Sequence, residues 1–206
     1  MRENEMSVDG FVFVDLETTG TVATQCEILE IGFELCNADL EPIERLEILP
    51  VTTGTTALIE RLRSDPEFEV VANMHTENGL FADLEAAVAS ADALPTGMAG
   101  YEDDVLQTLT RWGVDDTTPL SGTSHRMDRD FLAQWMPKVD AMFSYRMIDS
   151  RVFTEAGRIL DPARTAERTS LIAEYGGPTH RVAEDMHHSA NVLRVFHGRA
   201  PIPFQP

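Results

Sequence analysis

Two carboxylates follow a short apolar run near the start of the chain. Residues 11–14 (FVFV) have the composition of a buried strand, and Asp15 and Glu17 come directly after them. Side chains at positions i and i+2 of a strand point to the same face, so these two carboxylates converge. Like charges held so close are costly unless a cation neutralises them, and oxygen ligands suit Mg²⁺ or Mn²⁺. The D-x-E spacing recurs elsewhere in this acidic chain, but only here does it end an apolar strand.

A histidine and an acid are spaced five residues apart where the last predicted loop becomes the last predicted helix. His180 is a natural general base for a metal-bound water, because its ordinary pKa lies near neutral pH, and Asp185 is a further candidate ligand. The same spacing occurs at His125 and Asp130, so the spacing alone leaves both pairs open. Asp128, on a predicted helix, is either a surface acid or another ligand.

The elements that must position these residues change in type along the chain. Three strands with short links predict an antiparallel meander, and alternating helices and strands follow it. The expected strands are 11–14, 28–36, 43–49, 119–122 and 143–149, and the expected helices are 57–63, 81–90, 101–113, 126–136, 150–160 and 181–197. We therefore expect an α/β fold with a mixed five-stranded sheet flanked by helices. One domain over 11–200 is enough, with a disordered N-terminal tail (1–10) and a C-terminal tail (201–206).

Composition limits the possible partners. The net charge of −19 opposes tight binding of long nucleic acid, although residues 121–206 alone carry a net charge of +1 and can present arginines to a few phosphates. No apolar run approaches the ~18 residues that a membrane span requires, and the polar start does not resemble a signal peptide. We expect a cytoplasmic protein without a membrane segment, in which Cys26 and Cys36 are reduced thiols.

Three ordered motifs resemble those of the DEDDh 3′→5′ exonucleases, a superfamily with a ribonuclease H-like fold. They are DLETTG (15–20), Asp128-x-x-Phe-Leu and His180-x4-Asp185. Within this superfamily the chain looks most like oligoribonuclease, through segments 73–80, 121–149 and 179–196. The resemblance implies a 3′→5′ exoribonuclease that degrades short single-stranded RNA to nucleoside 5′-monophosphates.

The resemblance also implies roles for the acids and the histidine. Asp15, Glu17, Asp128 and Asp185 would hold two divalent metal ions, Mg²⁺ or Mn²⁺, and His180 would deprotonate the attacking water. Such a pair of metals activates the water and stabilises both the entering and the leaving oxygen.

Further residues match the family's substrate contacts. Thr18 lies in the substrate-contacting turn, and His75 matches a residue beside the bound nucleotide. Ser124 and Arg146 match groups that cap the 5′ phosphate, and an arginine fork suits a phosphate geometrically. Tyr145 matches an aromatic residue that the second subunit of a homodimer stacks on a base.

The chain departs from the family mainly around the substrate. Thr21 stands where the family has a leucine wedge, and Arg151 where it has a phosphate-binding serine. Asn78 and Thr123 replace a serine and an asparagine. These departures keep open a 3′→5′ exonuclease on single-stranded DNA or longer RNA. A catalytically inactive interaction module is the third alternative, and the five retained residues argue against it.

Overall fold

Five strands form one mixed sheet in a computed structural model that describes residues 8–206. The strand order is β3-β2-β1-β4-β5. The strands are β1 (Gly10–Thr18), β2 (Ile28–Asn37), β3 (Pro42–Ile48), β4 (Leu120–Gly122) and β5 (Met147–Asp149). β1 to β3 pair antiparallel, whereas β4 pairs parallel with both β1 and β5. The predicted mixed sheet with an antiparallel meander first is confirmed.

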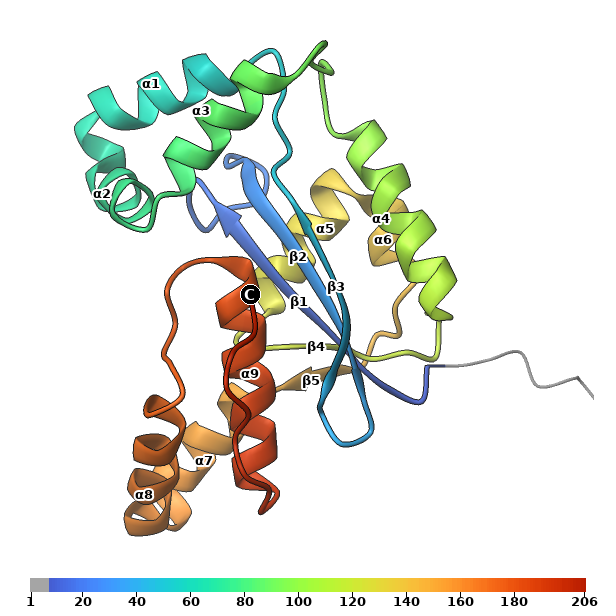
Figure 1. Cartoon of the computed structure of the whole chain (residues 1–206), viewed down its shortest axis with the longest axis vertical. Coiled ribbons are helices and arrows are strands. Elements are labelled where there is room, and N and C mark those ends of the chain that lie inside the picture. The colour runs from blue at the N-terminus through green and yellow to red at the C-terminus, as the bar shows by residue number, and fades with distance from the viewer. Residues whose placement is uncertain (1–7) are drawn as a thin grey trace, which may run out of the picture.

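Helices cover both faces of the sheet (Figure 1). They are α1 (Thr55–Ser64), the 3-10 turn η1 (Pro66–Phe68), α2 (Glu69–Glu77), α3 (Leu80–Ser90), α4 (Ala99–Trp112), α5 (Arg126–Trp135), α6 (Pro137–Asp140), α7 (Arg151–Leu160), α8 (Pro162–Ala173) and α9 (Val182–Phe196). α9 lies across one face, α4 to α6 lie against the other, and α1 to α3 gather beyond the end of β1 (Figure 1). No helix within residues 8–206 is long and apolar enough to cross a bilayer.

The alternation of side chains along β1 explains why both faces are covered. Val12, Val14 and Leu16 join the core formed with α4 and α5, while Phe13 joins the core formed with α9. A strand buried on both faces carries apolar residues at successive positions, as FVFV does. Asp15 therefore leaves the strand on the α9 side.

The prediction of a strand over 143–149 was wrong in its first half. Only Met147–Asp149 pairs with β4. The Ser144 N–H donates instead to the Thr118 carbonyl at 2.8 Å, and the Arg129 guanidinium donates to the carbonyl of Ser144. These bonds hold the start of the segment as a connection between α6 and β5. Sequence patterns also missed α2, α6 and α8.

The structure describes the expected C-terminal tail in full and the expected N-terminal tail only from residue 8. Residues 1–7 lie outside the described residues, and β1 begins at Gly10, inside the expected tail. Residues 201–206 have no regular secondary structure but pack against α9. The Ile202 N–H donates to Asn191 Oδ1 at 2.8 Å, and the Ile202 carbonyl accepts from Asn191 Nδ2 at 2.9 Å.

The close approach of α9 to β2 depends on Gly32. A Cβ at this position would lie 2.6 Å from Val182 Cβ and 2.7 Å from Met186 Cε. We predict that Gly32→Ala lowers the free energy of unfolding by about 1–3 kcal/mol, because the helix must shift away from the sheet. Urea unfolding of the purified variant measures this loss.

Gly100, on α4, provides the matched control. A Cβ there meets no atom within 4 Å. Gly100→Ala should be neutral or stabilising by up to about 1 kcal/mol, because alanine favours a helix more than glycine does. Equal effects of the two substitutions would contradict the packing role of Gly32.

Candidate active site

One open pocket of about 460 Å³ is lined by all five predicted catalytic residues. Asp15 and Glu17 come from the end of β1, Asp128 from the first turn of α5 and Asp185 from the first turn of α9. His180 lies in the loop that precedes α9. A volume of this size suits a small ligand.

Asp128 is tied to β1 between the two strand carboxylates. Its Oδ1 accepts a hydrogen bond from the Leu16 backbone N–H at 2.9 Å, and its residue is 4% exposed. Leu16 lies beyond Phe13, the last residue of β1 that pairs with β4, and its N–H donates to Asp128 at this end of the strand. This one hydrogen bond places the carboxylate of Asp128 beside those of Asp15 and Glu17.

Burial raises the pKa of every acid in this site, and repulsion by the other acids adds to it for Asp15 and Glu17. The pKa of Asp15 is raised well above its usual range, first by burial and then by Asp128, Glu17 and Asp185. Burial and then Asp185 raise the pKa of Glu17 to about 8, and burial raises that of Asp128 to about 7. Burial also raises the pKa of Asp185. The folded chain therefore resists holding these four groups ionised together.

The arrangement fits a divalent cation. Asp15 Oδ2 is buried without a hydrogen-bond partner among the described residues. Glu17, His180 and Asp185 each offer one ligand atom, and these atoms lie within 4.8 Å of one another. Carboxylate oxygens are the ligands that Mg²⁺ and Mn²⁺ prefer, and a cation would relieve the repulsion described above.

The two His-x4-Asp pairs are separated by the tertiary structure. His180 is exposed, and Asp185 Oδ1 accepts from the backbone N–H of Thr179 at 2.8 Å. His125 is fully buried and its Nε2 lies 3.0 Å from the Leu120 carbonyl, whereas Asp130 is exposed and paired with an arginine. Of the two pairs, only His180 and Asp185 line the pocket.

The residues predicted to contact substrate fall into two groups. Thr18, Ser124 and the substituted Thr21 line the pocket. His75 does not: it is fully buried behind β1, where its Nε2 donates to the Thr18 carbonyl at 3.3 Å and lies 3.9 Å from Glu17 Oε2. In this arrangement His75 supports the strand end.

Tyr145, Arg146 and Arg151 lie outside the lining of this pocket. Tyr145 is 82% exposed, and the Arg146 guanidinium lies 5.4 Å from the centre of its ring. Arg151 begins α7 and pairs with Glu155 at 3.7 Å. One chain by itself does not bring these three side chains to the carboxylates.

Sequence reasoning missed a buried ion pair beside the site. Glu30 is 3% exposed and lies opposite Glu17 in the β1–β2 register. The Arg181 guanidinium donates to it at 2.9 Å. Two signals were available in the sequence. Glu30 is an acid within the predicted strand 28–36, and Arg181 is a basic residue directly after His180.

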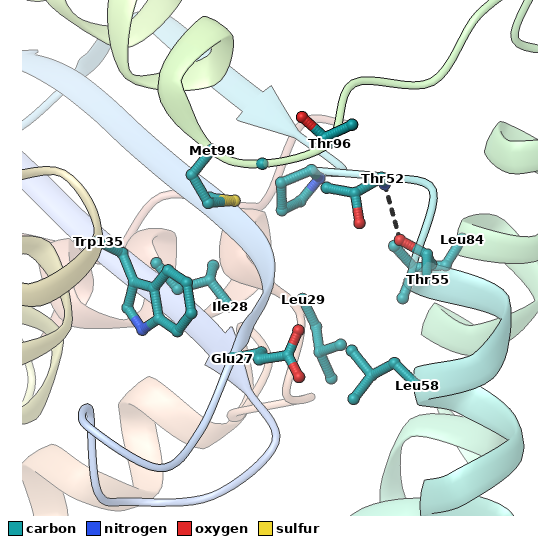
Figure 2. Close-up of a pocket in the computed structure, with 12 residues that line it drawn as sticks. Glu27, Ile28, Leu29, Thr52, Thr55, Leu58, Leu84, Thr96, Met98 and Trp135 are labelled. Atoms are coloured by element: carbon teal, nitrogen blue, oxygen red, sulfur yellow. Dashed lines mark hydrogen bonds between the residues drawn. The ribbon is translucent and has the colours of Figure 1, made fainter.

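A second hollow, of about 120 Å³, lies between β2 and the loops that flank α1 and α4 (Figure 2). Its lining includes Ile28, Leu58, Met98 and Trp135. Glu27 is the one charged side chain among the described residues that form it. Acid–base chemistry or binding of a divalent cation needs several titratable groups together, and this lining offers only Glu27, so this hollow is not the candidate site.

Comparisons with known proteins agree with the motifs. The chain is 28% identical to the oligoribonuclease of Mycobacterium leprae over 195 residues, which cover 95% of this chain and 83% of that protein. It is 26% identical to the oligoribonuclease of Francisella tularensis subsp. tularensis, over 92% of this chain and 95% of that protein. No family model matches the chain. These relatives confirm the resemblance to oligoribonucleases.

Solved structures of exonuclease I share the fold. One covers 95% of this chain with a TM-score of 0.55 and 13% identity. Exonuclease I from Methylocaldum szegediense covers 93% of it with a TM-score of 0.55 and 15% identity. The chain spans about 42% and 41% of the length of these two proteins. At such identity the likeness shows the fold alone.

The crowded carboxylates predict an unusual dependence of stability on pH. The folded pKa of Glu17 is about 8, against 4.5 ordinarily, so the metal-free folded chain binds more protons than the unfolded chain between these values. The free energy of unfolding should therefore fall as pH rises from about 5 to about 8 in EDTA. Thermal melts across this range measure the slope.

Glu17→Gln should flatten this slope and raise the melting temperature at the alkaline end in EDTA. Glu60→Gln, at an exposed position of α1, is the matched control and should leave the slope unchanged. A parental slope that persists in Glu17→Gln would refute the assigned burial and repulsion.

Proposed function

We propose that this chain, a homologue of the oligoribonucleases, is a metal-dependent 3′→5′ exoribonuclease that degrades short oligoribonucleotides to nucleoside 5′-monophosphates. The observation that carries the proposal is the convergence of four buried or half-buried carboxylates and one exposed histidine on a single pocket. The curated relatives at 26–28% identity support the substrate class.

The carboxylates would hold the metal ions. Asp15, Glu17, Asp128 and Asp185 are the residues that would bind two divalent cations, Mg²⁺ or Mn²⁺. When bound, such cations activate a water molecule and stabilise the entering and leaving oxygens of an in-line displacement. The orphaned Oδ2 of Asp15 and the raised pKa values of all four acids support this assignment.

His180 would act as the general base. Its side chain is exposed at the mouth of the pocket and lies beside Glu17 and Asp185. In this role it accepts the proton of the attacking water.

The substrate would be a short single-stranded RNA. Thr18, Ser124 and Thr21 line the pocket, together with the apolar side chains of Val71 and Met74. A net charge of −19 repels long polyanions, so a few well-placed contacts must supply the affinity.

A second copy of the chain would complete this pocket. Tyr145 is 82% exposed and lies outside the pocket lining of its own chain. α7, which follows it, also exposes Val152, Ile159 and Leu160, at 60%, 83% and 82%. Exposed apolar side chains grouped in this way favour an interface, and a two-fold dimer is the commonest assembly. Arg146 and Arg151 would then provide guanidinium forks for the 5′ phosphate.

The alternative function is a 3′→5′ exonuclease on single-stranded DNA or longer RNA. It is favoured by Thr21, a polar residue of the pocket lining where the oligoribonuclease family has an apolar wedge. Without that wedge, the protein binds the bases of a very short substrate less tightly. Contacts along a longer strand then supply a larger share of the binding free energy.

An assay on 5′-phosphorylated RNA dimers, RNA 20-mers and DNA dimers tests the function. We expect RNA dimers to be hydrolysed fastest, EDTA to abolish activity and Mn²⁺ or Mg²⁺ to restore it. His180→Ala should lower kcat about 10²–10⁴-fold, because the water loses its base. His197→Ala, at the exposed end of α9, is the matched control and should keep parental activity.

The outcomes separate the alternatives. Equal rates on dimers and 20-mers, or faster hydrolysis of DNA, would favour the second function. An inactive parent protein with either metal, on every substrate, would refute both.

The dimer is tested by complementation between two inactive or weakened variants. Tyr145→Ala should lower kcat/KM for RNA dimers by the equivalent of about 1–3 kcal/mol of lost base stacking. Asp15→Asn should be inactive. In a mixed dimer, the chain with intact acids receives Tyr145 from its partner, so mixing the two proteins should raise activity above the sum of the separate samples. Sedimentation of a fully active monomer would contradict this assembly.

A further inference from the structure

His180 is held in an unfavourable backbone conformation. Its φ is +57°, in the left-handed region that side chains other than glycine rarely adopt. This conformation aims the imidazole into the pocket between Glu17 and Asp185. A strained residue in an exposed loop keeps such a conformation only when neighbouring groups hold its backbone in place.

The residues on either side of His180 are fixed by charged groups. The Thr179 N–H before it donates to Asp185 Oδ1 at 2.8 Å. The Arg181 guanidinium after it donates to buried Glu30 at 2.9 Å and pairs with Asp83 at 2.8 Å. These contacts anchor the two neighbours of His180, and Asp185 also accepts from the backbone N–H of His180, but none of them reaches the His180 carbonyl.

Asn78 supplies a contact to the peptide group of His180 itself. Its side-chain Nδ2 donates to the His180 carbonyl, across 102 positions of the sequence. Its Oδ1 accepts from the Leu80 N–H at 3.1 Å, which fixes the amide at the start of α3. The Asn78 carbonyl also accepts from Arg181 at 3.4 Å. One half-buried amide thus joins the α2–α3 turn to the loop that carries the histidine.

We propose that Asn78 is a positioning residue for His180: its side-chain amide holds the His180 peptide in the left-handed conformation that directs the imidazole toward the attacking water. The inference rests on the proposed function, in which His180 is the general base. Asn78 is not among the residues that line the pocket, and its side chain bonds to the His180 carbonyl and the Leu80 N–H rather than to any of the four carboxylates. Its effect on the reaction therefore passes through His180 alone.

Asn78→Asp separates the two roles of this side chain. A carboxylate keeps the oxygen that caps the Leu80 N–H, but it removes the donor to the His180 carbonyl and places an acceptor there. We expect kcat on 5′-phosphorylated RNA dimers to fall about 10- to 100-fold, as for a misplaced catalytic group. KM and the calorimetric affinity for Mn²⁺ should stay within about twofold of the parent, because the ligands are untouched. Asn73→Asp, an exposed site on α2, makes the same chemical change without the contact and should match the parent.

Hydrogen exchange of the metal-free protein measures the tether without any activity. Amides of residues 176–181 should exchange faster in Asn78→Asp, whereas those of α2, α3 and α9 should keep their parental rates. An unchanged rate in this loop would overturn the proposal. If the parent protein hydrolyses no substrate, the proposed function fails with the catalytic role, while this exchange result still decides whether Asn78 restrains the loop.

The double variant decides whether Asn78 acts through His180. In a His180→Ala background there is no imidazole to position, so adding Asn78→Asp should cost no further activity. A further loss as large as that of the single variant would overturn the proposal, since it would show damage to the fold or to the metal site. Parental kcat in Asn78→Asp would overturn it equally.

Discussion

Repulsion among buried carboxylates at the end of β1 is the constraint on which the rest of this structure depends. Burial raises the pKa values of all four acids, repulsion from the other acids raises those of Asp15 and Glu17 further, and Asp15 Oδ2 is buried without a partner among the described residues. Arg181 neutralises the nearby Glu30 instead. Charges kept unpaired in this way cost stability, and a bound cation is the physical means of recovering it.

The fold meets this constraint by sharing the acids among separate elements. The strand contributes two of them because its alternating side chains place both on the α9 side, while its other face remains apolar and packs against α4 and α5. Gly32 then permits α9 to approach the sheet closely enough to bring Asp185 over the strand end. Asp128 arrives from α5 through one backbone hydrogen bond. Stability and chemistry use opposite faces of the same strand.

The layer formed by α1 to α3 supports the site from outside. His75 lies behind β1 and donates to the Thr18 carbonyl, so a histidine predicted to contact substrate instead braces the strand end in the single chain. Asn78, at the turn between α2 and α3, reaches the loop before α9. His75 lies on α2 and Asn78 caps the C-terminus of this helix, which periodicity did not predict, since α2 buries only Ala72 and His75 and so shows little amphipathic pattern.

What the sequence by itself determined is the sheet, its meander and which acids share the pocket, because strand alternation and ordered motifs are local features of the sequence. The paired carboxylates after FVFV follow from the two-residue period of a strand alone. Spacing alone left His180 and His125 open and the family resemblance selected His180, but only the tertiary structure shows that His125 is fully buried while His180 lines the pocket. It also decided the ion pair of Glu30 with Arg181 and the contact of Asn78 with His180, which join residues more than 100 positions apart. Spacing along the chain carries no information about such contacts, because packing of α9 and the α2–α3 turn against β1 and β2 creates them.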